Sequence, residues 1–180
     1  IWAASDFTGL GNNLPTNLDG TQVMVNNVAA AVYYVSPTQV SFQVPAGITG
    51  TASVRVIVNG VTSNSVSAAA ATNAPGIFPV TMGGINYPAA IFLDGKVAAD
   101  PANGPGFRNA VPGDTLQLYA TGLAPSPAGM VVATTLVSGV TVTIGSVTIP
   151  ALAALVAVGE FQINFTVPQD FAWMAAGVYP

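Results

Sequence analysis

The sequence predicts an all-β protein, and three features point to this class. Apolar and polar residues alternate in residues 39–44, 53–58 and 162–167, which is the pattern of strands that bury one face. Asn59-Gly60 lies between two alternating runs and favours a two-residue hairpin turn, because both residues tolerate a positive φ. The chain also has 19 glycines and 14 prolines, and no window sustains a helical period.

An internal repeat organises the chain. Residues 23–28 lead to residues 39–45, and a similar pair of segments recurs at residues 142–147 and 162–168. Each copy consists of a strand, a tight turn, an apolar strand, a short loop, an alternating strand and a closing Val-Pro. A repeat of this length predicts two related β-sheet domains in tandem.

The repeat also decides one ambiguous segment. Residues 151–158 are all apolar and have a helical composition, but they fill the place that residues 29–35 fill in the first copy, so a strand is expected. We therefore predict two tandem immunoglobulin-like β-sandwich domains, residues 1–72 and residues 73–180. A boundary near residues 68–79 is marked by an alanine run that meets Asn-Ala-Pro-Gly.

The alternation in the last strand of each copy predicts which side chains are buried. Phe42 and Phe165 hold equivalent positions and are expected inside their sandwiches. Their neighbours Gln43 and Thr166 are expected outside, because successive side chains of a strand point to opposite faces.

The two copies differ at their ends. The first continues into a complete hairpin at residues 52–68, whereas the second stops twelve residues after its Val-Pro. A sandwich that lacks a strand leaves an apolar groove beside unpaired backbone groups. We expect a neighbouring subunit to fill this groove with an extended segment, for which residues 1–14 are the candidate donor. The alternative is that the sequence is a fragment of a longer product.

Charge and composition exclude several functions. The ten charged residues are Arg55, Lys96, Arg108, Asp6, Asp19, Asp94, Asp100, Asp114, Asp170 and Glu160. Three cations do not supply a surface that follows nucleic-acid phosphates. The chain has no histidine or cysteine, which removes the usual zinc, haem and iron–sulfur ligands, disulfides and histidine-based nucleophile activation. The longest apolar stretch, residues 149–158, is too short for a membrane helix of about 20 residues.

The carboxylates suggest two candidate sites, and each has a simpler interpretation. Asp94, Asp100 and Asn103 could supply oxygens to calcium, but their spacing matches no calcium loop, and Asp and Asn also form turns. Glu160 and Asp170 could act as a glycosidase pair if they faced one cleft. Glu160 begins a predicted strand and Asp170 lies beyond its end, which disfavours that arrangement.

Three further features are candidate sites. Lys96 could serve as a base or an isopeptide donor, but it follows a hairpin turn, where a solvated lysine is ordinary. Asn164-Phe165-Thr166 is a glycosylation sequon within a predicted strand. Four aromatic residues could form a sugar-stacking platform or fill a core or interface. They are Trp2, Trp173, Tyr33 and Tyr34. No catalytic, cofactor-binding or metal-binding residue is assigned.

Several motifs in fixed order resemble a known family. They are Tyr33-Tyr34-Val35-Ser36-Pro37-Thr38-Gln39, Gln43-Val44-Pro45, Val58-Asn59-Gly60-Val61-Thr62-Ser63, Ala74-Pro75-Gly76-Ile77-Phe78, Pro112-Gly113-Asp114 and Leu118-Tyr119-Ala120-Thr121-Gly122-Leu123. Together they resemble the uncharacterised C-terminal domain family abundant in secreted proteins of Solibacter-type acidobacteria. The resemblance implies an exported, cell-surface or extracellular protein of immunoglobulin-like modules, and it carries no established catalytic residues.

The expected function is that of a non-enzymatic, extracellular structural protein that self-assembles into a filament or surface layer by strand addition. Copies with so few charges repel one another weakly, and edge strands without charged residues are open to pairing. The alternative is an adhesive module that binds glycan or the cell envelope as part of a longer secreted protein. A third class is a secreted hydrolase whose catalytic part lies outside this chain.

Overall fold

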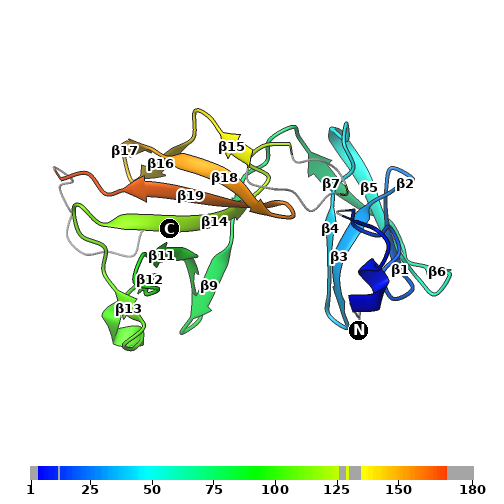
Figure 1. The fold of residues 1–180 in the computed structure, drawn as a ribbon, viewed down its shortest axis with the longest axis horizontal. Helices are drawn as coiled ribbons and strands as arrows, with labels where there is room; N and C mark the ends of the chain where they lie inside the picture. Colours follow the sequence, from blue (N-terminus) through cyan, green and yellow to red (C-terminus); the bar gives the residue numbers. More distant parts are fainter. Residues whose placement is uncertain (1–3, 12, 126–128, 130–134, 170–180) are drawn as a thin grey trace. The chain divides into compact units, whose positions relative to one another are not determined.

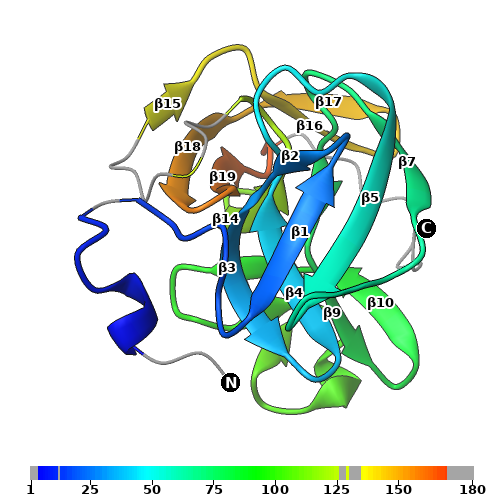
Figure 2. The same cartoon turned by 90° about the vertical axis from the view of Figure 1, so that its right-hand side faces the viewer.

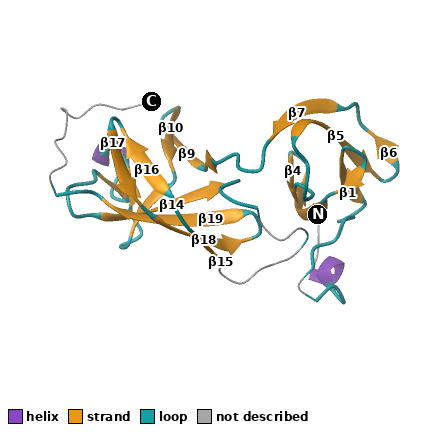
Figure 3. Ribbon diagram, turned by 90° about the horizontal axis from the view of Figure 1, so that it is seen from above, coloured by secondary structure: helices purple, strands orange, loops and turns teal. Residues whose placement is uncertain are grey.

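The computed structural model describes residues 4–11, 13–125, 129 and 135–169, and the chain is all-β, as predicted. Helix in this part is confined to two short 3-10 turns, η1 (Ala4–Phe7) and η2 (Pro101–Asn103), which are purple in Figure 3. The chain divides into two compact units (Figure 1). Unit 1 comprises Ile1–Ala74, Gly122–Thr134 and Val156–Gly159, and unit 2 comprises Pro75–Thr121, Thr135–Leu155 and Glu160–Pro180.

Unit 1 is built from two sheets (Figure 2). Its strands are β1 (Thr21–Val25), β2 (Val28–Ala29), β3 (Ala31–Ser36), β4 (Gln39–Gln43), β5 (Gly50–Val58), β6 (Val61–Thr62) and β7 (Val66–Ala70). One sheet has the order β2-β1-β5-β6, with β7 also paired to β5, and the other is the β3–β4 hairpin. The Asn59-Gly60 turn joins β5 to β6, and both residues have a positive φ, as predicted.

The core of unit 1 lies between these sheets. Val23 and Val25 on β1 are 0% and 1% exposed, and Val54 and Val56 on β5 pack against the same cluster. The antiparallel register pairs Val23 with Val56 and Val25 with Val54. Because paired residues lie on the same face of a sheet, the two strands bury one continuous apolar surface.

The prediction for Gln43 was wrong, although the predicted alternation of β4 is present. Val40 and Phe42 pack against the core cluster, with Phe42 half-buried, so Gln43 points to the outer face. Gln43 is nevertheless only 8% exposed. Gly129 covers it, since the backbone N–H of Gly129 donates a hydrogen bond to Gln43 Oε1.

The described part of residues 1–14 is also not a free donor segment, which corrects a second expectation. It begins with η1, and Phe7 packs against the core of unit 1. Leu14 is 6% exposed, and its backbone N–H donates to the carbonyl of Gly129 at 2.6 Å. The segment therefore belongs to the packing of unit 1. Residues 1–3 and 12 lie outside the described residues.

Unit 2 contains one large sheet and two separate hairpins. The large sheet runs β13-β12-β11-β14-β19-β18-β15, with β8 also paired to β14, and the hairpins are β9–β10 and β16–β17. The strands are β8 (Gly76–Ile77), β9 (Pro79–Met82), β10 (Ile85–Pro88), β11 (Ala90–Phe92), β12 (Val97–Ala98), β13 (Phe107–Arg108), β14 (Thr115–Thr121), β15 (Thr135–Val137), β16 (Thr141–Ile144), β17 (Val147–Pro150), β18 (Leu152–Ala157) and β19 (Glu160–Thr166).

Two predictions for unit 2 are confirmed. The apolar run at residues 151–158 is the strand β18 and not a helix. Phe165 on β19 is 5% exposed and lies opposite Leu116 of β14, whereas Thr166 is exposed. The repeat therefore holds at the level of elements, because β16 to β19 follow in the same order as β1 to β4.

Candidate functional site

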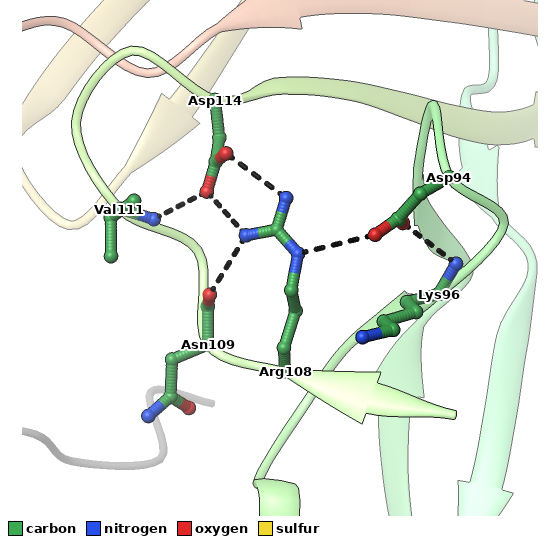
Figure 4. Close-up of polar contacts among 6 residues, drawn as sticks. All are labelled: Asp94, Lys96, Arg108, Asn109, Val111 and Asp114. Carbon is green, nitrogen blue, oxygen red and sulfur yellow. Dashed lines mark hydrogen bonds and ion pairs between the residues drawn. The ribbon is translucent and has the colours of Figure 1, made fainter. Parts of the chain in front are cut away.

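In unit 2, charged side chains surround Arg108, which is the last residue of β13 and precedes β14 in the chain (Figure 4). The guanidinium of Arg108 donates two hydrogen bonds to the Asp114 carboxylate, Nη1 to Oδ2 at 2.8 Å and Nη2 to Oδ1 at 3.0 Å. Asp114 Oδ2 also accepts from the backbone N–H of Val111 at 2.7 Å. A bidentate pair of this kind fixes both side chains in orientation as well as in distance.

The surroundings of Arg108 stabilise its charge and its position. Its guanidinium carbon lies 3.4 Å from the ring centroid of Phe92, which is 2% exposed, so the cation is stacked on a buried aromatic face. Its Nε lies 3.9 Å from Asp94 Oδ2. The hydrogen bonds to Asp114 raise the pKa of Arg108 above its ordinary value. The same pairing, helped by the Val111 N–H, lowers the pKa of Asp114.

Asp114 also closes the turn that leads into β14. Its backbone N–H donates to the Val111 carbonyl, with Pro112 and Gly113 between them and Gly113 at φ 89°. Proline followed by a residue with positive φ is the pattern of a type II turn. The N–H of Gly113 and the carbonyl of Asp114 both bond to Val167, directly after β19. The Arg108–Asp114 pair therefore holds this turn against the sheet. Both side chains are hydrogen-bonded to each other, so neither is available as a catalytic acid or base.

The candidate calcium ligands have separate local roles. Asp94 Oδ1 accepts from the backbone N–H of Lys96 at 3.1 Å, and its Oδ2 faces Arg108. Asp100 caps η2 by accepting from the N–H of Ala102 at 2.9 Å, and Asn103 lies within that turn. Within the described residues, no three acidic side chains form a group that could hold a metal ion.

The remaining polar candidates are not brought together. Glu160 begins β19, while Asp170 lies outside the described residues. Lys96 is exposed in the turn between β11 and β12. Asn164 of the sequon is in the middle of β19, where its Oδ1 accepts from Gln162 Nε2 at 2.9 Å.

Tyr33 and Tyr34 are both exposed because β3 contains a bulge. The pairing of β3 with β4 shifts between Val32 and Tyr34, so Tyr33 has no partner in the register. Val32 is fully buried, whereas Tyr33 and Tyr34 are 47% and 37% exposed. Strict alternation would have turned one of the two tyrosines inward, and the bulge turns both outward. The two other aromatic candidates, Trp2 and Trp173, lie outside the described residues.

The outer edge of β16 is the other unusual feature. In the described part of the chain, β16 pairs only with β17, in a two-stranded sheet. Its repeat equivalent, β1, pairs with β2 on one edge and with β5 on the other. The strand β16 (Thr141–Ile144) carries no charged residue.

Residues 4–73 match the family model of the IPT/TIG domain. This TIG domain has an immunoglobulin-like fold, which confirms the predicted fold class for unit 1. The match ends before unit 2 begins at Pro75. No curated protein and no solved structure matches the chain.

The matched family indicates only a coarse class of function for the matched residues. Modules of this kind are often involved in adhesion or protein interaction and are generally not catalytic. The narrower resemblance to the acidobacterial family stays an expectation. No helix in the part of the chain that the structure describes is long and apolar enough to cross a membrane.

Proposed function

We propose that this chain is a non-enzymatic structural protein of the cell exterior, which assembles with copies of itself into a filament or surface layer through strand addition. The observation that carries the proposal is that several edge strands of the described sheets lack charged residues. They include β7 in the TIG domain and β15 and β16 in unit 2. Charged side chains on an edge strand oppose pairing with another chain, and these edges have none.

Three of the charged side chains of unit 2 are paired with one another within the unit. Arg108 is bound to Asp114 and stacked on Phe92, and Asp94 faces Arg108. They contribute little repulsion between copies, because opposite charges in contact cancel at a distance. The formal net charge of the chain is only −4 over 180 residues, so electrostatic repulsion between copies is weak and opposes self-association little.

Apolar side chains are exposed beside one of these edges. Leu136 on β15 is 80% exposed and Leu152 on β18 is 75% exposed. Leu136 lies opposite Ala154, two residues after Leu152, so the two leucines share a face of the sheet. An exposed apolar face next to an edge that pairs with no other described strand is typical of a surface that another chain covers.

Assembly is tested by negative-stain microscopy and light scattering of the full chain over a range of concentrations. We expect filaments or sheets that grow with concentration. Leu136→Lys, which places a charge on the edge strand β15, should weaken assembly. Leu93→Lys is the matched control, because Leu93 is also an exposed leucine, at 73%, but it lies in a turn. A wild-type chain that stays monomeric at every concentration would refute the proposal.

A second candidate function is glycan adhesion, and the bulge at Tyr33 supports it. Two adjacent exposed tyrosines offer aromatic faces on which sugar rings can stack. Ser41 lies opposite Tyr34 and accepts from Gln39 Nε2, so hydrogen-bonding groups flank the rings. Co-sedimentation with insoluble neutral polysaccharides tests this function. Binding that the double substitution Tyr33→Ser and Tyr34→Ser leaves unchanged would exclude this platform.

A further inference from the structure

The chain contains two Asn-Gly sequences, and the structure places them in different surroundings. Asn59-Gly60 forms the two-residue turn between β5 and β6, and Asn103-Gly104 ends the 3-10 turn η2. Both asparagines are exposed. In such a pair the backbone nitrogen of the glycine can attack the side-chain amide carbon of the asparagine, because glycine has no Cβ to obstruct the approach. The hydrogen bonding of that nitrogen therefore affects how readily each pair reacts.

The nitrogen of Gly104 is engaged within η2. Its N–H donates to the carbonyl of Pro101 at 3.0 Å, and the N–H of Asn103 donates to the carbonyl of Asp100 at 3.0 Å. The side chain of Asp100 caps the same turn by accepting from the N–H of Ala102 at 2.9 Å. An attack by the Gly104 nitrogen first has to break its hydrogen bond to Pro101, which slows the reaction.

The nitrogen of Gly60 has no such restraint. The turn is held by the pairing of Val58 with Val61 and by the N–H of Asn59, which donates to the carbonyl of Gly20 at 2.9 Å. In the part of the chain that the structure describes, no backbone hydrogen bond from the Gly60 N–H is present. A Cβ placed on Gly60 would meet no atom within 4 Å, so the space around this residue is open.

The equivalent turn between β1 and β2 shows how an asparagine in this position is protected. Asn26 Oδ1 accepts from the N–H of Ser53 at 2.8 Å, which holds the carboxamide in place. The next residue is Asn27, whose side chain obstructs the approach of its own nitrogen. Asn59 is followed by glycine instead.

We infer that Asn59 is a site of spontaneous deamidation, a modification that goes beyond the proposed self-assembly and does not depend on it. The Gly60 nitrogen forms a bond to Asn59 Cγ and gives up its proton. The bond from Cγ to Nδ2 breaks, and ammonia leaves with that proton. Water then opens the resulting cyclic imide at either of its two carbonyl groups. One product is an aspartate and the other is an isoaspartate, and neither step needs an oxidant or a reductant.

Both products change this end of the TIG domain. Asn59 lines the same groove as Asp19, and Asn59 Oδ1 lies against Gly20. A carboxylate at position 59 therefore adds a second negative charge to that groove. Isoaspartate also places an extra carbon in the backbone of a two-residue turn, which disturbs the register that pairs Val58 with Val61.

Peptide mapping of the full chain tests the site. Trypsin cuts after Arg55, Lys96 and Arg108, so the two Asn-Gly pairs fall in separate peptides, residues 56–96 and 97–108. The native protein is incubated in mildly alkaline buffer, and mass spectrometry with fragmentation follows the conversion of each amide to an acid. We expect Asn59 to convert at least about five times faster than Asn103, because Gly104 first has to lose a hydrogen bond. Labelling by an isoaspartate methyltransferase should identify part of the product as isoaspartate.

Two controls connect the difference in rate to the structure. In denaturant the hydrogen bond of Gly104 is absent, so the two asparagines should convert at similar rates. Asp100→Ala removes the cap of η2, and it should raise the rate at Asn103 severalfold while leaving the rate at Asn59 unchanged. A native Asn59 that converts no faster than Asn103 would overturn the inference. A ratio of the two rates that is the same in native and unfolded protein would overturn it as well.

Asn59→Asp separates the new charge from the change in the backbone. Aspartate tolerates the φ of 49° at this position, so the variant should keep the pairing of β5 with β6. Aged wild-type protein enriched in isoaspartate should melt at a lower temperature than Asn59→Asp. Equal melting temperatures would overturn the effect on the turn.

Discussion

Asp114 gives the clearest prediction at the scale of single residues. Its pKa is lowered by Arg108 and the Val111 N–H, so its charged form is favoured by folding. The resulting stability is present above the ordinary carboxylate pKa of about 3.9 and is lost as the pH falls through the lower folded value. Asp114→Asn should therefore lower the melting temperature at pH 7, and the gap from wild type should narrow below about pH 4.

Thermal denaturation between about pH 7 and 2 measures this gap. Asp94→Asn is the control, because Asp94 Oδ2 is 3.9 Å from Arg108 Nε and its side chain is 51% exposed, so a smaller effect is expected. The raised pKa of Arg108 lies far above this range, so its own contribution stays constant there. A gap between wild type and Asp114→Asn that is the same at every pH would contradict the assigned role.

Gln43 gives a second prediction at this scale. Gln43→Ala removes the acceptor for the Gly129 N–H in a covered position, and it should destabilise the protein by about 1–3 kcal/mol. Gln39 lies four positions earlier on the same face of β4 and is exposed. Gln39→Ala should therefore change stability by less than about 0.5 kcal/mol. Denaturant unfolding of both variants measures the difference, and equal effects would show that Gly129 does not bind Gln43 in solution.

At the scale of elements, β19 is an interior strand of the large sheet in unit 2. It lies between β14 and β18, and its inward residues Phe161, Ile163 and Phe165 are all buried. Phe165→Ala should cost about 3–5 kcal/mol, because truncating a buried phenylalanine loses its apolar burial and leaves a cavity in the core.

Thr166→Ala is the control within the same strand, since Thr166 is exposed and bonds only to Thr115 among the described side chains. It should cost less than about 1 kcal/mol in the same unfolding experiment. A larger cost for Thr166→Ala than for Phe165→Ala would mean that the register of β19 is shifted by one residue.

At the scale of the whole molecule, the few ionisable groups predict a flat dependence of stability on pH. The chain has no histidine and only ten charged side chains. Between the ordinary pKa values of carboxyl groups and those of lysine and tyrosine, folding should change proton binding very little. The melting temperature should therefore stay nearly constant from about pH 4 to 9. Scanning calorimetry across this interval checks it, and a fall of tens of degrees would reveal a coupled charge network.

The sequence by itself determined the all-β class, the hairpin at Asn59-Gly60 and the strand at residues 152–157. These features depend on periodicity, on turn residues and on the comparison of two repeats, all of which are local or can be read by alignment within the chain. The equivalent positions of Phe42 and Phe165 were found in the same way. Alternation was sufficient to say which face of the strand each occupies.

The tertiary structure alone decided which of those faces are covered. Gln43 points outward as predicted, yet it is buried by Gly129, 86 positions away in the sequence. Arg108 similarly meets Phe92 and Asp114 only because β13 comes close to the ends of β11 and β14. The alternation of residues in a strand predicts which face of the sheet each side chain points to. Whether that face is buried, and which side chains meet there, depends on the residues that pack against it from elsewhere in the chain.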